Sequence, residues 1–486
     1  MKKIFSIVFI VGFVFILASC SSPYPGDRYY DEAFIDGIDS DEHQMIVENP
    51  FVNTAVNNKS NISLSSNTAA YSFIRSQINS GKTVDRNVVR IEEMVNFFRY
   101  EYNQPLEGDV FGFKSELIET PWNPETHLLL VGLETKKVDL GDVPTNLVVL
   151  LDVSGSMSAS NKLPLVKASM KLLLEQMKPQ DKISLVTYSS GEKVIFEGKT
   201  IEDLTYINRQ IDILRASGST AGKKGLEMAY EVAQTHFIEG GNNRIILATD
   251  GDFNVGISNT NTLVEYISEK RESGIYFSAF GFGYGNYKDE KLERIAMAGN
   301  GVYHYIDDML SARKAFVDNI DGLLYTVARD AKAQIEFNHN AVLEYRLIGY
   351  ENRQLSNEQF DDETTDAGEI GTGLQVTAIY EVKLQEQAID DLASLMIRYK
   401  AHDTTDETEL ETQFDVLNVL NQFPSKDASF ISAVVEFGLL LINSEYKVDA
   451  SLDALIERIK SDPNNSTDYY RSDFVETLEK YQLMVQ

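Results

Sequence analysis

The central part of the chain alternates short apolar segments with segments of helical periodicity, and this alternation constrains the fold more than any other feature. Strands are expected at residues 147–151, 182–188 and 245–248, and helices such as 163–177 lie between them. Strands separated by helices of this length are joined by right-handed crossovers and form a mostly parallel sheet covered on both faces. The alternation continues to about residue 327. It predicts an α/β fold with a doubly wound, Rossmann-like parallel sheet.

The segments on both sides of this region have the alternating pattern of β-strands. Short extended runs fill residues 110–140, and after about Asp330 further strands are expected, among them 333–337, 342–350 and 374–384. Neither group has enough strands to cover its own apolar face. We therefore expect the two groups to form one β-rich domain into which the α/β domain is inserted.

These patterns divide the whole chain into consecutive regions. The regions are a signal peptide (1–19), a flexible tether (20–48), a helical N-terminal segment (49–105), the first half of the β-rich domain (106–143), the α/β domain (144–330), the second half of the β-rich domain (331–402) and a helical C-terminal domain (403–486). The tether is rich in Asp, Glu, Ser, Pro and Gly, a composition that does not fold by itself.

The N-terminus predicts export and a lipid anchor. Residues 4–18 are apolar and follow the basic start Met1-Lys2-Lys3, but the run is shorter than the roughly 20 residues that a membrane-spanning helix needs. It ends at Leu17-Ala18-Ser19-Cys20, and Cys20 is the only cysteine of the chain. This segment resembles a bacterial lipobox, which implies cleavage before Cys20 and attachment of lipid, palmitate among the acyl chains, to that residue. An ordinary signal peptide with a chance cysteine is the alternative.

The expected location is therefore the outer face of a bacterial membrane. A lipid anchor at Cys20 would hold the protein to the cell membrane or the outer membrane, facing outside the cytoplasm. The formal net charge of −30 would repel DNA, RNA and anionic lipid, so we expect no nucleic-acid partner. The six histidines are scattered without zinc-ligand spacing, which argues against zinc chemistry.

Two strands of the predicted parallel sheet lead into acidic loops. The strand at 147–151 runs into Asp152-Val-Ser154-Gly-Ser156, and the strand at 244–249 delivers Asp250. Between them lies a polar turn, Gly218-Ser-Thr220-Ala-Gly222. Ligands of open parallel sheets bind beyond the carboxyl ends of the strands, where these loops would lie.

This set of residues resembles the metal-ion-dependent adhesion site of von Willebrand factor type A domains. The resemblance implies that Ser154, Ser156 and Thr220 supply hydroxyl ligands, and that Asp152 and Asp250 contribute directly or through water. Such all-oxygen ligation suits Mg²⁺, Mn²⁺ or Ca²⁺ rather than zinc or copper. In this family one coordination position is left for a carboxylate of the partner, which implies a protein partner that presents Asp or Glu. A decayed site that keeps the fold without a metal is the alternative.

The resemblance extends beyond this domain to a bacterial group of von Willebrand factor type A lipoproteins. It is carried by residues 89–98, 345–352, 366–373 and 434–441, the last in a C-terminal domain of unknown function. One departure is Leu374, where the pattern of the group leads us to expect a histidine.

Two classes of function remain open. The first is a surface module that captures an acidic side chain of a protein partner through its metal, without catalytic residues. The second is a metal-dependent hydrolase that uses the same carboxylates. The first is favoured because the sequence supplies no clear general base, and Asp252 is the only nearby candidate. A structural role in an envelope assembly differs from the first only in the permanence of the partner.

Overall fold

The computed structural model describes residues 46–486, apart from 142, 220–222, 252, 254–259, 284–288, 387–389, 402–407 and 467. The predicted signal peptide, Cys20 and most of the predicted tether lie outside the described residues. At the end of the predicted tether, Ile46 is buried whereas Val47 is exposed. Within the described part of the chain, no helix is long and apolar enough to span a bilayer.

The α/β domain is built on a six-stranded sheet with the order β10-β9-β8-β5-β6-β7. Its strands are β5 (Thr145–Asp152), β6 (Lys182–Tyr188), β7 (Glu192–Lys199), β8 (Asn242–Thr249), β9 (Ile275–Phe282) and β10 (Tyr303–Ile306). Neighbouring strands pair in parallel, except that β7 is antiparallel to β6. The predicted α/β fold with a parallel sheet is therefore confirmed. The edge strand β7 is an addition to it.

Helices cover both faces of this sheet. They are α3 (Leu163–Gln176), α4 (Leu204–Ile213), α5 (Lys223–Thr235), α6 (Thr260–Arg271), α7 (Asp289–Ala298), α8 (Met309–Arg313) and α9 (Ile320–Leu324). Alternate residues of β5 belong to different cores: Val148 packs in the core that includes α5, α6 and α7, and Val149 in the core that includes α3 and α4. The alternation is expected to continue to about residue 327, but its last helical part is interrupted by a π-helical turn (Lys314–Asp318) and ends at Leu324, because Thr326 already begins β11.

Two further sheets form the β-rich domain. The first has the order β1-β12-β15-β4-β3 and the second the order β13-β2-β11-β16-β17, with β14 also paired to β11. The strands are β1 (Val52–Asn53), β2 (Lys59–Ser63), β3 (Phe111–Glu119), β4 (His127–Thr135), β11 (Thr326–Phe337), β12 (Val342–Ile348), β13 (Gln354–Leu355), β14 (Gly368–Gly371), β15 (Gln375–Leu384), β16 (Asp391–Ala401) and β17 (Glu409–Leu417). Buried residues of both sheets share one core. Because β4 pairs with β15, the expected pairing of strands before and after the α/β domain is confirmed.

Two predicted helical regions begin with strands instead. The segment 49–105 opens with β1 and β2, and β2 pairs with β11 and β13. The region 403–486 contains β17, which pairs with β16 along its length. The sequence of β2, KSNIS, has little apolar alternation, so backbone pairing rather than hydrophobic periodicity places it in the sheet. In β17 most side chains are exposed or half-buried, as expected at an edge.

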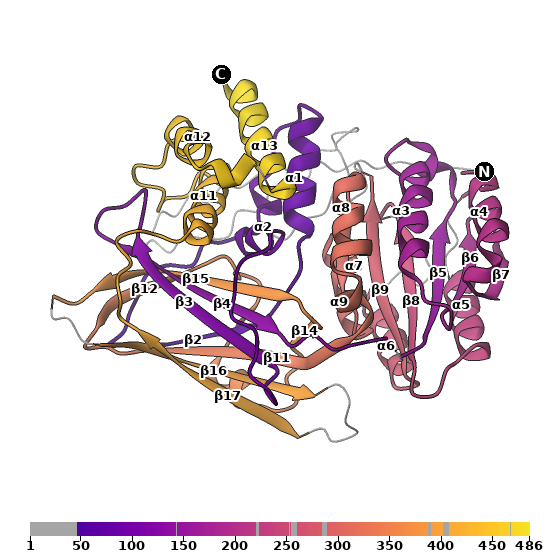
Figure 1. Ribbon diagram of the computed structural model, residues 1–486, viewed down its shortest axis with the longest axis horizontal. Helices are drawn as coiled ribbons and strands as arrows, with labels where there is room; N and C mark the ends of the chain where they lie inside the picture. Colours follow the sequence, from indigo (N-terminus) through magenta and orange to yellow (C-terminus); the bar gives the residue numbers. More distant parts are fainter. Residues whose placement is uncertain are drawn as a thin grey trace, which may run out of the picture. The chain divides into compact units, whose positions relative to one another are not determined.

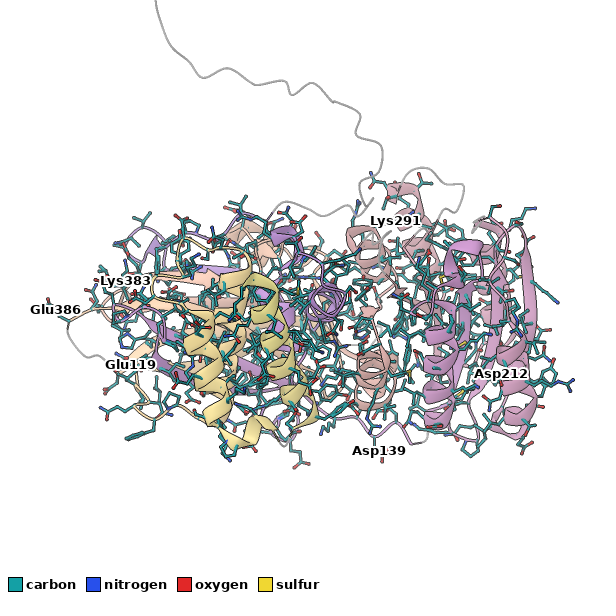
Figure 2. All side chains as sticks on the ribbon, turned by 90° about the horizontal axis from the view of Figure 1, so that it is seen from above. Glu119, Asp139, Asp212, Lys291, Lys383 and Glu386 are labelled. Atoms are coloured by element: carbon teal, nitrogen blue, oxygen red, sulfur yellow. The ribbon has the colours of Figure 1, made fainter. Side chains whose placement is uncertain are left out.

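The remaining helices form a layer over the first sheet. They are α1 (Ala69–Asn79), α2 (Ile91–Asn96), α11 (Lys426–Leu441), α12 (Leu452–Ser461) and α13 (Tyr469–Val485). Figure 1 shows this layer above β3, β4 and β15, with α1 next to the α/β domain, and α2 contacts β15 while α1 contacts β10. In Figure 2, Asp212 of the α/β domain and Lys383 of β15 lie at opposite ends of the folded unit, with the helical layer between. The N- and C-terminal helices thus join the two domains.

Candidate metal centre at the edge of the parallel sheet

The two aspartates of the predicted site lie at the same edge of the sheet. Asp152 is the last residue of β5, and Asp250 follows the last residue of β8. These strands are parallel neighbours, with Leu151 paired to Ala248. Their carboxyl ends therefore deliver both side chains to one place, as predicted from the strand pattern.

The loop after β5 is fixed by a buried anchor and by backbone hydrogen bonds. Met157 is fully buried in the core beneath α3, which pins the loop that carries Ser154 and Ser156. The amide of Gly155 donates to the carbonyl of Gly218 at 2.9 Å. A Cβ atom on Gly155 would lie 3.3 Å from that oxygen, so glycine suits this close approach.

The polar turn that leads to Thr220 is held next to this loop. Besides the contact with Gly218, the amide of Ser217 donates to the carbonyl of Val153 at 2.7 Å. The amide of Ser219 donates to the Ser190 hydroxyl at 2.9 Å. Thr220 itself lies outside the described residues, so its predicted role as a ligand stays a prediction.

Asp152 and the two serines form a compact oxygen cluster. The Asp152 side chain is buried, and its Oδ1 accepts a hydrogen bond from the Ser154 amide at 2.7 Å. The hydroxyls of Ser154 and Ser156 are 3.0 Å apart. Ser154 is buried whereas Ser156 is exposed, so the cluster extends from the interior to the surface. The second carboxylate oxygen of Asp152, Oδ2, is buried without a hydrogen-bond partner among the described residues.

Asp250 is paired with a lysine that the sequence analysis did not single out. The ammonium group of Lys162 donates to Asp250 Oδ2 at 2.8 Å, and neither side chain is more than 11% exposed. The other oxygen, Asp250 Oδ1, is buried and has no hydrogen-bond partner in the described part of the chain. Lys162 precedes the first residue of α3, at a position where no motif marked it as part of the site.

Aromatic and backbone contacts close the inner side of the cluster. Phe253, three residues after Asp250, is fully buried and packs edge-on against Tyr188 with ring centroids 5.6 Å apart. Lys291 of α7, labelled in Figure 2, donates to the carbonyl of Phe253 at 2.7 Å. These contacts hold the chain after Asp250 against the end of the sheet.

Burial and mutual repulsion shape the electrostatics of the site. Burial, with a smaller contribution from the negative charge of Asp250, raises the pKa of Asp152 to about 6, although hydrogen bonds from Ser154 act in the opposite direction. Burial also raises the pKa of the Tyr188 hydroxyl well above its usual value, and the carboxylate of Asp152 adds to this shift. A buried acid whose charged form is disfavoured beside a second carboxylate forms a site that a cation would stabilise.

The donor set fits a hard divalent cation. Each aspartate offers a buried oxygen that has no hydrogen-bond partner within the described residues, and the serines add hydroxyl oxygens. Oxygen ligands of this kind are the ones that Mg²⁺, Mn²⁺ and Ca²⁺ prefer. Among the described residues, no group of three or more His, Cys, Asp or Glu side chains is placed to hold a metal. A metal here would therefore depend on the hydroxyl ligands as much as on the carboxylates.

The fold and these loops define a von Willebrand factor type A domain protein, and comparison with known families agrees. The family model of the von Willebrand factor type A domain matches residues 146–320, a second von Willebrand factor model matches 38–130, and the model described as uncharacterized protein YfbK, C-terminal, matches 322–484. The uncharacterized protein YfbK of Escherichia coli (strain K12) is 37% identical over 464 residues, which cover 90% of this chain and 80% of that protein. The chain belongs to the YfbK family.

Other known proteins are less similar and cover smaller shares of the chain. Inter-alpha-trypsin inhibitor heavy chain H3 of Mesocricetus auratus is 26% identical over 219 residues, which cover 43% of this chain and 24% of that protein. Among solved structures, the von Willebrand factor type A protein from Catenulispora acidiphila is 14% identical and covers 76% of this chain and 90% of its own, with a TM-score of 0.41. Another is BatB from Bacteroides thetaiotaomicron, 20% identical, covering 36% of this chain and 97% of its own, with a TM-score of 0.32.

Proposed function

We propose that this protein is a lipid-anchored, extracytoplasmic binding module whose von Willebrand factor type A domain holds a divalent metal and captures an acidic side chain of a protein partner through it. The observation that carries the proposal is the pair of buried carboxylate oxygens, Asp152 Oδ2 and Asp250 Oδ1, which have no hydrogen-bond partner among the described residues and lie at the start of loops that also carry two hydroxyls. Leaving a buried carboxylate oxygen without a hydrogen bond costs on the order of 1–3 kcal/mol, and a bound cation would remove that cost.

The ligands of the proposed metal are Ser154, Ser156 and Thr220, with Asp152 and Asp250 binding directly or through water. Mg²⁺ is the expected metal, and Mn²⁺ or Ca²⁺ would suit the same oxygens. The cluster extends outward to the exposed Ser156, so a partner carboxylate could approach from that side. The alternative of a metal-dependent hydrolase rests on Asp252, which lies outside the described residues.

The anchor belongs to the same proposal. A signal peptide cleaved before Cys20 would place the domain outside the cytoplasm, where the acidic tether would hold it away from the membrane. The partner would then be a membrane or envelope protein within reach of the tether.

The proposal is tested by capture from solubilised membranes of the native organism in the presence of Mg²⁺. We expect the full chain to retain a protein that EDTA releases and that Asp152→Ala does not retain, because the variant loses one carboxylate of the site. The variant Lys171→Met serves as the control, since Lys171 lies on α3 in an exposed ion pair. A partner bound equally well by Asp152→Ala, or retained in EDTA, would show that binding does not use the metal.

A further inference from the structure

The side chain of Lys162 is built into the metal centre rather than resting on the surface. Its ammonium group lies 2.8 Å from Asp250 Oδ2, and the whole residue is only 9% exposed. A surface ion pair would be worth little and would exchange with water, whereas this pair is shielded from solvent. Lys162 is therefore a fixed positive charge next to one of the two aspartates.

A glycine fixes the position of this lysine. Gly283, directly after β9, has a φ of +78°, and a Cβ atom there would lie 2.5 Å from Cγ and Cε of Lys162. The aliphatic stem of Lys162 thus occupies the space that any other residue at 283 would fill. The Tyr305 hydroxyl donates to the carbonyl of Gly283 at 2.7 Å and holds this backbone in place. The lysine is directed at Asp250 by packing as well as by charge.

The charges of the site show what this cation does. Asp152 and Asp250 contribute −2 and Lys162 contributes +1, so the three side chains together carry −1. A dication bound to them would give a total of +1, whereas the two aspartates alone would give zero. Lys162 therefore repels an incoming metal and leaves the loaded site with a surplus positive charge.

We propose that Lys162 is a resident cation that weakens metal binding and makes the loaded centre dependent on an anionic ligand. The inference rests on the proposed metal site and deepens it. Metal and partner carboxylate then bind cooperatively, because the carboxylate neutralises the surplus charge and each ligand raises the affinity for the other. When no partner is bound, Lys162 compensates the negative charge of the buried Asp250.

The test is calorimetric titration of Mn²⁺ into the full chain, with and without millimolar acetate as a probe carboxylate. Lys162→Met keeps the aliphatic stem over Gly283 and removes only the charge, so we expect it to bind Mn²⁺ at least about tenfold more tightly than the unmodified protein. Acetate should tighten Mn²⁺ binding by the unmodified protein, and it should have a much smaller effect on Mn²⁺ binding by Lys162→Met. Lys171→Met, on the same helix, should match the unmodified protein. Lys162→Gln, which retains a polar side chain, should bind Mn²⁺ like Lys162→Met. It replaces Lys162→Met in the titration if the methionine variant does not fold.

Two results separate the inference from the proposed function. If the unmodified protein binds Mn²⁺ and both Lys162 variants bind it equally well or more weakly, the resident-cation inference is overturned and the metal site stands. If neither the unmodified protein nor the variants bind Mn²⁺, the metal site itself is wrong and the inference falls with it.

Discussion

Arg75 of α1 joins the helical layer to the α/β domain, and its replacement by methionine provides a quantitative test of how the two are held together. The Arg75 side chain is fully buried. Its guanidinium donates to both carboxylate oxygens of Asp307, at 2.5 and 2.9 Å, to Asp308 at 2.8 Å and to Asp473 of α13 at 3.0 Å. Asp307 and Asp308 directly follow β10. The Arg75 side chain therefore connects α1, the end of the parallel sheet and the last helix.

The expected loss of stability follows from the burial of the partners. Asp307 is 3% exposed and would be left without its cation, and breaking a buried pair costs about 3–5 kcal/mol. Asp473 and Asp308 are 23% and 47% exposed, so water replaces part of what they lose. We therefore expect Arg75→Met to lower the free energy of unfolding by about 3–4 kcal/mol, which at about 1 °C per kcal/mol for a folded unit of this length lowers the melting temperature by roughly 3–4 °C.

The loss should depend on pH. Burial raises the pKa of Asp307, and Arg75 opposes this shift, so removing Arg75 raises the pKa in the folded protein further. A carboxyl group with a folded pKa above its unfolded value gains protons on folding, and its contribution improves as the pH falls. The deficit of Arg75→Met relative to the unmodified protein should therefore be smaller at pH 5 than at pH 7.5.

Melting of the full chain at both pH values provides the measurement. The control is Lys171→Met, whose ion pair with Asp212 is 42% and 58% exposed and should contribute less than about 0.5 kcal/mol. Adding Asp307→Asn to Arg75→Met should restore part of the stability, because the buried charge is then absent. A deficit of Arg75→Met below about 1 kcal/mol, or one that grows toward pH 5, would refute the reasoning.

Three further perturbations test other parts of the account. Cys20→Ala should stop maturation or release the protein from membranes in detergent partitioning, and a variant that matures and partitions like the unmodified protein contradicts the anchor. Met157→Ala should cost about 2–5 kcal/mol and weaken Mn²⁺ binding, because the fully buried side chain pins the loop of Ser154; a melting temperature unchanged within error argues against this. Lys314→Met should stabilise the protein at pH 7 by about 1 kcal/mol, because burial lowers the pKa of Lys314 to about 8 and the charged form is therefore disfavoured. This gain should shrink near pH 9.5, where the lysine is already neutral in the folded protein, and a gain that increases with pH would be inconsistent with it.

The parts of the fold that follow from side-chain periodicity could be predicted from the sequence. The strands predicted at 147–151, 182–188 and 245–248 match β5, β6 and β8, because parallel strands buried on both faces are continuous apolar runs. β2 and β17 could not be predicted in this way, since their places depend on backbone pairing with β11 and β16, which are distant in the sequence. The same limit applies to the interruption of the helix before β11.

The candidate site was predictable where its residues end a strand or lie in the loop directly after one. Asp152 and Asp250 lie together because β5 and β8 are neighbours, an arrangement that the order of the strands indicates. Lys162 was missed because its reach to Asp250 depends on the entry into α3 and on the space left by Gly283, and neither leaves a pattern in the sequence. The structure therefore shows a positively charged lysine beside ligands that the sequence analysis described only as carboxylates and neutral hydroxyls.

Titration calorimetry of Mg²⁺ and Mn²⁺ into the full chain measures the central claim most directly. Extracytoplasmic oxygen sites often bind weakly, on the order of 10⁻⁴ to 10⁻³ M, so millimolar metal is required. The account predicts binding to a single site that Asp152→Ala abolishes and Ser156→Ala weakens less, because the first removes a charged ligand and the second a neutral hydroxyl. Metal should raise the melting temperature of the unmodified protein, and the size of the rise should follow the strength of this binding. No heat and no melting shift with Mg²⁺, Mn²⁺ or Ca²⁺ would contradict the account and leave a domain that keeps the fold without the metal.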